Sequence, residues 1–181
     1  MTEERFDILN PEGNATGQSA LKSEVHQKGL WHHSAHVWIY NSQGKILVQK
    51  RAKTKKLFPN VWDVSVAGHV VSGETPLLGA VREMEEELGI ITGAEHLDFK
   101  GIYRISLEVD EERTENEFYY IYFHHFGGEL SSLTLQEEEV AEVAWKSVEE
   151  LEREVVVENR YYPHGKEYYD FVLEALRKRL F

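Results

Sequence analysis

The sequence predicts an α/β protein, in which helices cover both faces of a central mixed β-sheet to form an α/β/α sandwich. Runs of apolar and aromatic residues predict strands or extended segments at 35–40, 46–50, 63–71, 97–109, 116–126 and 140–145. Apolar residues at helical spacing predict helices at 76–88 and 165–180. With 181 residues, 41% of them hydrophobic, the chain is long enough for one domain with a sizeable core.

We expect a single domain spanning 1–181, with 1–28 as a partly irregular N-terminal extension. Polar residues dominate this stretch, so only a short strand at 6–9 and a helical turn at 19–26 are expected there. Four histidines then fall within eleven residues, at His26, His32, His33 and His36. The cluster suggests a metal site, yet histidines near a strand are more often surface or core polar groups than ligands.

The strands at 35–40 and 46–50 are joined by the sequence NSQGK, which predicts a β-hairpin. The next stretch, RAKTKK, is the densest basic patch in an acidic chain and contains Arg51 and Lys55. It is either a grip for a diphosphate or an ordinary solvated loop, and both alternatives stay open. The extended segment at 63–71 then brings Gly68 to the loop that precedes the first long helix.

The second half of the chain continues the sheet and closes it with helices. Strands at 97–109 and 116–126 are joined by the acidic turn DEERTE, and another short strand follows at 140–145. Ser147 is placed to cap a helix at 148–153. In the last helix, we expect one face to lie against the sheet, formed by Tyr168, Val172, Ala175 and Leu176.

The helix at 76–88 has signals at both ends. Thr75 can cap its N-terminus, and Pro76 suits the first helical position, where an N–H has no partner to lose. Gly89 suits a left-handed cap at the C-terminus. At about 100° per residue, one narrow apolar stripe faces the core, formed by Leu77, Val81, Met84 and Leu88.

On the other side of this helix, Glu83, Glu86 and Glu87 fall within an arc of roughly 100°. Carboxylates this close repel one another by roughly 0.2–0.5 kcal/mol per pair, so a bound cation would stabilise them. Mg²⁺ prefers oxygen ligands and usually completes its coordination with water and substrate phosphates. Taken alone, such a run in an acidic protein is more often a solvated helix face.

The residues around this helix follow a spacing typical of one family. Five residues separate Gly68 from Glu74, and seven separate Glu74 from Arg82. Seven identities occur at the required intervals, namely Gly68, Glu74, Arg82, Glu83, Glu86, Glu87 and Gly89. A chance match is very unlikely, and the stretch resembles the box of the Nudix hydrolases. The resemblance implies the Nudix fold and cleavage of nucleoside diphosphates linked to another moiety, by attack of water on phosphorus.

The resemblance also implies roles for individual residues. Glu83, Glu86 and Glu87 would bind Mg²⁺ or Mn²⁺, while Arg82 and Glu74 would form an ion pair that orients loop and helix. Gly68 would let the backbone approach a phosphate. A non-catalytic nucleotide sensor on the same fold would be expected to have lost a glutamate, and none is lost here.

Glu86 is our first choice as general base, because it shares the face that would carry the metal. Some branches of the family use a glutamate from a distant loop instead. The alternatives here are Glu117, Glu137, Glu138 and Glu139.

From 32 to 89, the layout is similar to isopentenyl-diphosphate isomerases, a branch of the same superfamily. Those enzymes have a catalytic cysteine immediately before a Gly-His pair, where this chain has Ala67. The chain contains no cysteine, whereas the hydrolase glutamates are all present, so we favour a hydrolase over an isomerase. The isomerase metal site suggests second-tier candidates, expected to be structural or substrate-facing rather than ligands: His32, His69, Glu115 and Glu117.

Composition limits the partners. The net charge of −12 argues against a polyanion bound by a broad basic face, so DNA and long RNA are not expected. The lack of cysteine excludes disulfides, thiolate metal sites and thiol nucleophiles. No run approaches the roughly 20 apolar residues of a membrane span, and a secretory signal is missing, so we expect a cytoplasmic enzyme without membrane contact. The expected partner is a small-molecule diphosphate substrate, and a homodimer is possible because dimers are common in the family.

Overall fold

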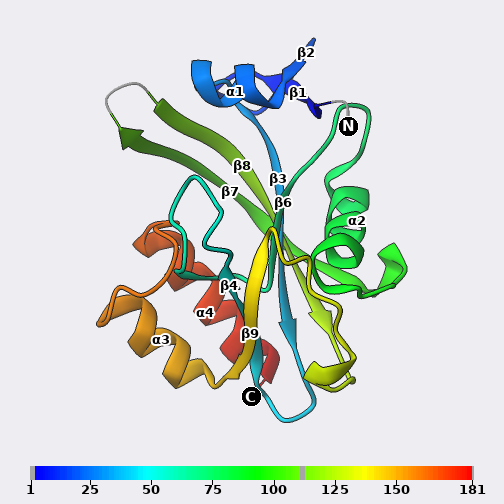
Figure 1. Ribbon diagram of the computed structural model, residues 1–181, viewed down its shortest axis with the longest axis vertical. Coiled ribbons are helices and arrows are strands. Elements are labelled where there is room, and N and C mark those ends of the chain that lie inside the picture. The colour runs from blue at the N-terminus through cyan, green and yellow to red at the C-terminus, as the bar shows by residue number, and fades with distance from the viewer. Residues whose placement is uncertain (1–2, 111–112, 181) are drawn as a thin grey trace.

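The computed structural model describes residues 3–110 and 113–180 (Figure 1). Its main sheet follows the path β5-β4-β3-β8-β7, with β6 also paired with β3 and β9 with β4. These strands are β3 (His32–Tyr40), β4 (Ile46–Arg51), β5 (Trp62–Asp63), β6 (Val66–His69), β7 (Leu97–Asp110), β8 (Arg113–His125) and β9 (Val140–Lys146). β3 and β8 run parallel and the other pairs run antiparallel, so the predicted mixed sheet is confirmed.

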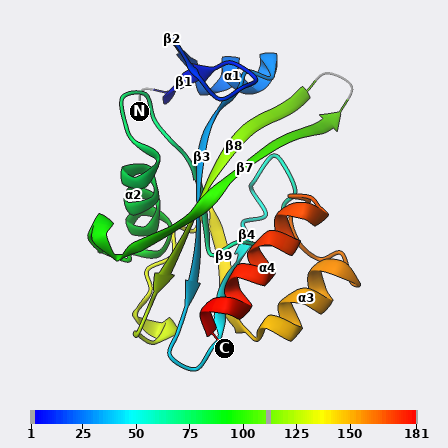
Figure 2. The ribbon, with the colours of Figure 1, turned by 180° about the vertical axis from the view of Figure 1, so that it is seen from behind.

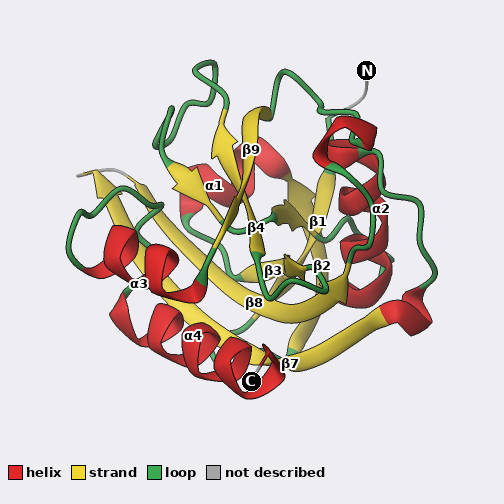
Figure 3. Ribbon diagram, turned by 90° about the horizontal axis from the view of Figure 1, so that it is seen from below, coloured by secondary structure: helices red, strands yellow, loops and turns green. Residues whose placement is uncertain are grey.

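Helices cover both faces of this sheet (Figure 3). On one face, α2 (Pro76–Leu88) packs on a core cluster that includes Val37 and Ile39 of β3. On the other face, α3 (Val148–Val156) and α4 (Lys166–Leu180) lie side by side over a cluster that includes Trp38 and Tyr40 (Figure 2). Successive side chains of β3 thus point to opposite faces, as the pleat of a strand requires. The α/β/α sandwich predicted from the sequence is confirmed.

Both predicted ends of α2 are present. The Thr75 side chain accepts a hydrogen bond from the backbone N–H of Leu78, and Pro76 is the first helical residue. Gly89 has φ of 69°, and its N–H donates to the carbonyl oxygen of Glu85. Met84 and Leu88 are fully buried, so the apolar stripe faces the core as predicted.

Two predictions about the sheet need refinement. The segment at 63–71 is interrupted between β5 and β6, because the Ser65 hydroxyl donates to the carbonyl oxygen of Leu47 (2.6 Å) and accepts from the N–H of Ile39 (2.8 Å). The hairpin at 35–50 exists, but β3 and β4 pair directly only at Tyr40 and Ile46, since β6 occupies the earlier part of that edge. The tip of the predicted DEERTE turn, 111–112, lies outside the described residues.

The N-terminal extension is more regular than expected. β1 (Arg5–Leu9) and β2 (Ala15–Leu21) form an antiparallel pair, and α1 (Lys22–Lys28) follows. We call residues 3–28 the N-terminal lobe; it lies over one end of the main sheet (Figure 1) and has a small core around Phe6 and Val25. Because β2 is mostly exposed, its sequence carries no alternating apolar pattern that could predict a strand.

Two short 3₁₀ turns, η1 (Ala94–His96) and η2 (Leu130–Ser132), complete the regular structure in the described part of the chain. No helix within residues 3–110 and 113–180 has the length and apolar character needed to cross a membrane.

Replacing Tyr168 by phenylalanine is expected to lower the free energy of unfolding by about 1–3 kcal/mol. Tyr168 is fully buried, and its hydroxyl accepts from the Trp38 indole N–H (3.1 Å) and lies 2.8 Å from His36 Nδ1. The substitution leaves both groups buried without this partner. Urea unfolding would measure the loss. Tyr103→Phe is the control, because its hydroxyl makes only a 3.5 Å contact with Glu167; equal stability of the two variants would contradict the prediction.

Candidate functional site

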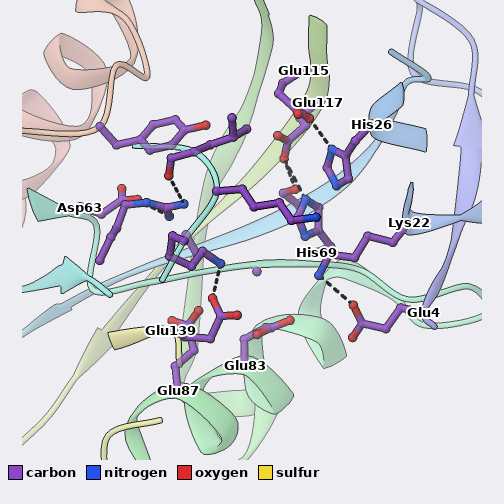
Figure 4. A pocket seen from close by; sticks show the side chains of 18 of the residues that line it. Glu4, Lys22, His26, Asp63, His69, Glu83, Glu87, Glu115, Glu117 and Glu139 are labelled. Atoms are coloured by element: carbon purple, nitrogen blue, oxygen red, sulfur yellow. Dashed lines mark hydrogen bonds and ion pairs between the residues drawn. The ribbon is translucent and has the colours of Figure 1, made fainter. Parts of the chain in front are cut away.

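A cavity of about 870 Å³ opens between α2, the main sheet and the N-terminal lobe (Figure 4). Its basic lining residues, within the described chain, are Lys22, Arg51, Lys55 and Lys56. Its acidic lining residues are more numerous, namely Glu3, Glu4, Asp63, Glu83, Glu86, Glu87, Glu115, Glu117, Glu138 and Glu139. An anionic ligand would meet a repulsive field here unless cations bound with it.

The three glutamates of α2 line one end of this cavity at different depths. Glu87 is 3% exposed, whereas the side chains of Glu83 and Glu86 are 13% and 48% exposed. Burial raises the pKa of Glu83 to about 7, although the neighbouring Arg82 opposes the shift. Burial, followed by the charges of Glu83 and Glu139, raises the pKa of Glu87 well above its ordinary value. The part of this face that carries Glu83 and Glu87 is therefore not solvated, and a divalent cation would offset the cost of its buried charge.

Gly68, at the end of β6, lies directly against Glu83. A Cβ atom at this position would stand 2.0 Å from Glu83 Cδ, so only glycine leaves room for the carboxylate in its present place. The close approach brings the backbone of β6 to the edge of the glutamate cluster.

Gly68→Ala is expected to lower activity at least tenfold while the melting temperature changes little. The obstructed atoms belong to the flexible end of the Glu83 side chain, which can rotate away without disturbing the fold but then leaves its place beside Glu87. Kinetics and thermal unfolding of the same preparations would check both parts. Gly127→Ala is the control, because the nearest atom to its added Cβ is 3.9 Å away. A fully active Gly68→Ala protein would show that the position of Glu83 is unimportant.

Arg82 makes the predicted ion pair with Glu74. Its Nη2 donates to Glu74 Oε2 (3.0 Å) and to the carbonyl oxygen of His69 (2.8 Å). Its Nη1 donates to Glu83 Oε1 (2.8 Å) and Glu86 Oε2 (3.0 Å). One guanidinium thus connects the loop before α2, the end of β6 and two of the three glutamates.

A second cluster lies across the cavity. One ring nitrogen each from His26, His32 and His69 lies within 4.8 Å of the others. Glu117 Oε2 is 4.0 Å from the Nε2 atoms of His32 and His69, and Glu115 Oε2 is 2.5 Å from His26 Nδ1. Figure 4 shows His69 and His26 beside the two glutamates. His33 and His36 point elsewhere, against Tyr120 and Tyr168 respectively.

The chemistry of this histidine cluster suits a metal ion. His32 Nδ1 lies 2.9 Å from the carbonyl oxygen of Leu30, which fixes the proton on Nδ1 and leaves the Nε2 lone pair free. Within the described residues, this Nε2 atom is buried without a hydrogen-bond partner. Burial also lowers the pKa of His32 to about 4, which keeps the ring neutral. His32, His69, Glu115 and Glu117, expected to be structural or substrate-facing, are thus brought together with His26 in an arrangement that could also hold a transition metal.

The predicted substrate-binding residues, Arg51 and Lys55, both line the cavity but already have carboxylate partners. Lys55 pairs with Glu139, and Arg51 Nη1 donates to Asp63 Oδ2 (3.2 Å). A phosphate that bound here would have to share or exchange these partners. The acidic loop that contains Glu139 thus reaches the cavity.

Asp63 and His164 form a buried pair that the sequence analysis missed. His164 Nε2 lies 2.6 Å from Asp63 Oδ1, and the two residues are 3% and 1% exposed respectively. Although burial alone would raise it, the charges of His164 and Arg51 hold the pKa of Asp63 at about 2. The two residues are about a hundred positions apart in the chain and match no local motif, so no signal in the sequence could have joined them.

Comparison with known proteins gives concordant matches. The model of the NUDIX domain family matches residues 30–168. An uncharacterized Nudix hydrolase of Clostridium acetobutylicum is 33% identical over 97% of this chain and 98% of its own. The isopentenyl-diphosphate Delta-isomerase of Serratia proteamaculans is 31% identical over 82% of this chain and 79% of its own. A crystal structure of a Deinococcus radiodurans protein covers 97% of this chain and 98% of its own, with a TM-score of 0.69 and 21% identity.

Proposed function

This chain belongs to the Nudix family of hydrolases, and we propose that it cleaves the diphosphate linkage of a nucleoside diphosphate, or of a small molecule linked to one, in a metal-dependent reaction. The observation that carries the proposal is the convergence of Glu83, Glu86 and Glu87 in one cavity. Glu87 is buried there with a raised pKa, which costs free energy unless a cation is bound. A purely structural role gives no reason to bury this carboxylate beside Glu83.

Glu83, Glu86 and Glu87 would hold Mg²⁺ or Mn²⁺, which supplies positive charge to the diphosphate oxygens and makes water a stronger acid. Glu86, the most exposed of the three, is the group we assign to take the proton from the attacking water. Arg82 and Glu74 keep the carboxylates in place, and Gly68 leaves the space that Glu83 needs.

Other residues of the cavity would bind the substrate or could serve as the general base in place of Glu86. Arg51 and Lys55, which line the same cavity as the glutamates, would contact the phosphates of the substrate. Of the four alternative bases, Glu117, Glu138 and Glu139 line the same cavity, whereas Glu137 is not among its lining residues.

An isomerase-like activity is the second candidate, because the histidine cluster assembles and an isopentenyl-diphosphate isomerase is among the relatives. Ala67 argues against it. This residue lines the cavity immediately before Gly68, where its methyl group can neither donate nor accept a proton. Incubation with isopentenyl diphosphate separates the two candidates, since hydrolysis releases phosphate or diphosphate whereas isomerisation leaves the phosphorus spectrum almost unchanged and moves a double bond.

Phosphorus NMR on a substrate panel would test the proposal. The panel contains nucleoside diphosphates, nucleotide sugars, dinucleotides and prenyl diphosphates, each with Mg²⁺ or Mn²⁺ in ¹⁸O-labelled water. We expect cleavage of a diphosphate bond in at least one nucleotide, no cleavage in EDTA, and ¹⁸O in the product at the phosphorus attacked. Binding of a nucleotide without turnover would instead favour a sensor and would refute the hydrolase.

A further inference from the structure

The N-terminal lobe contacts the loop before α2, residues 70–75, through the Asp7 carboxylate, through the backbone of Arg5, and through Val71, which packs against the small core of the lobe. Asp7 of β1 accepts hydrogen bonds from the Ser72 hydroxyl at Oδ1 (2.5 Å) and from the Gly73 N–H at Oδ2 (3.1 Å). The Ser72 N–H also donates to the carbonyl oxygen of Arg5 (2.7 Å). The turn at Ser72 and Gly73 is therefore held from outside the main sheet, by a strand about 65 residues earlier in the chain.

The other end of the same loop holds the catalytic helix. Glu74 follows Gly73 directly, and its Oε2 accepts from the Val71 N–H (3.3 Å) as well as from Arg82 (3.0 Å). Arg82 in turn donates to Glu83 and Glu86. Continuous contacts thus run from Asp7 through the turn and the Glu74–Arg82 pair to two carboxylates of α2.

β1 is firmly anchored, as it must be if Asp7 is to hold the 70–75 loop in place. Phe6, the neighbour of Asp7, is fully buried, and its ring stacks on His32 (5.4 Å between centroids) and His69 (4.8 Å). The Leu9 N–H donates to the carbonyl oxygen of Trp31 (2.8 Å), which fixes the far end of β1 just before β3. Alternation along the strand directs Phe6 to the histidines and Asp7 to the loop.

We propose that Asp7 is a positioning residue of the hydrolytic site, which fixes the 70–75 loop and thereby the Glu74–Arg82 pair that orients Glu83 and Glu86. The inference rests on the proposed function, and it assigns the N-terminal lobe a part in that site. Because Ser72 and Gly73 are exposed, these hydrogen bonds add little to global stability. The hydrogen bonds of Asp7 instead affect the geometry of Glu83 and Glu86. Residues that orient metal ligands without touching the metal typically change metal affinity in this way.

The test compares Asp7→Asn and Asp7→Ala with Glu12→Gln. The control removes a negative charge from the same lobe, at an exposed side chain that has no hydrogen bond or ion pair within residues 3–110 and 113–180. Both Asp7 variants are expected to raise the Mg²⁺ concentration for half-maximal hydrolysis about tenfold, with a nearly unchanged melting temperature. Glu12→Gln is expected to match the wild type. An unchanged Mg²⁺ requirement in both Asp7 variants would overturn the proposal.

A double-mutant cycle tests the route through Glu74. Electron paramagnetic resonance counts bound Mn²⁺ in the absence of substrate. The Mn²⁺ that is no longer bound in Glu87→Gln is assigned to the site on α2. If Asp7 acts through Glu74, Asp7→Asn weakens this site in the wild type but adds little in a Glu74→Gln background. Equal effects in both backgrounds would overturn the route. If the wild type binds Mn²⁺ on α2 but hydrolyses no substrate, only the proposed function is refuted. The Mn²⁺ titrations of the Asp7 variants still test the role of Asp7, because they need no substrate.

Discussion

Glu86→Gln is expected to lower kcat by about 10³-fold at saturating Mg²⁺ and to leave the fold intact. The amide cannot take a proton from water, and it also removes a negative charge from the face that would carry the metal. Because the Glu86 side chain is 48% exposed and its partner is Arg82 on the helix surface, its loss should change stability little. Steady-state kinetics on the best substrate of the panel, with thermal unfolding in parallel, would measure both effects.

Glu85→Gln is the matched control, since Glu85 is exposed and does not line the cavity. It should retain the activity of the wild type. If Glu86→Gln also remained nearly as active as the wild type, our choice of base would be wrong. Glu117→Gln, Glu138→Gln and Glu139→Gln would then be the next variants to compare, because all three carboxylates line the cavity.

Glu87→Gln is expected to have opposite effects on activity and on metal-free stability. Activity should fall at least 10²-fold, because the variant loses a buried carboxylate that we propose as a ligand of the cation. In EDTA at pH 8, the free energy of unfolding of the variant should be about 1–3 kcal/mol higher than that of the wild type, because an amide replaces the buried carboxyl group of Glu87. The Gln49 amide, which donates to Glu87 Oε2 (3.1 Å), keeps an acceptor in the variant.

The pH dependence follows from the direction of the shift. The pKa of Glu87 is raised in the folded protein, so between 4.5 and that raised value the folded state binds more protons than the unfolded state. Stability from this group therefore falls as pH rises through that window, and the advantage of Glu87→Gln grows with pH. Urea unfolding in EDTA at pH 4.5 and pH 8 would reveal this, and Mg²⁺ should stabilise only the wild type. A variant that is less stable than the wild type at pH 8 in EDTA would contradict the prediction.

Local signals were enough to predict the elements that carry the Nudix box. Thr75, Pro76 and Gly89 determine the ends of α2 through short-range hydrogen bonds, and its apolar stripe requires only a core to face. The strands of the main sheet were predictable because one or both faces are buried, which leaves alternating or continuous apolar runs. Predicted helices on both sides of a mixed sheet gave the α/β/α arrangement, which the family resemblance also implied and which the structure confirms.

The rest of the site depends on contacts between distant parts of the chain. His26 lies near His69 only because α1 is folded over the end of the sheet. The sequence did not predict the N-terminal lobe in full, because β2 has too few buried residues to show an apolar pattern. The burial of Glu87 could not be predicted from the sequence either. Helical periodicity places Glu87 on one face of α2, but it does not show that the loop containing Glu139 lies close to that residue. Asp63 and His164 meet for the same reason, through tertiary packing.

The parallel pairing of β3 with β8 has a consequence for how the protein is made. These strands are hydrogen-bonded from His32 and Glu117 to Tyr40 and His125, so a chain leaving the ribosome must extend past residue 125 before the pair can close. Such a distant pairing slows folding relative to proteins rich in local contacts. Both acidic partners of the histidine cluster lie on β8, so this cluster is completed late in biosynthesis, well after the helix that carries Glu83, Glu86 and Glu87 has emerged.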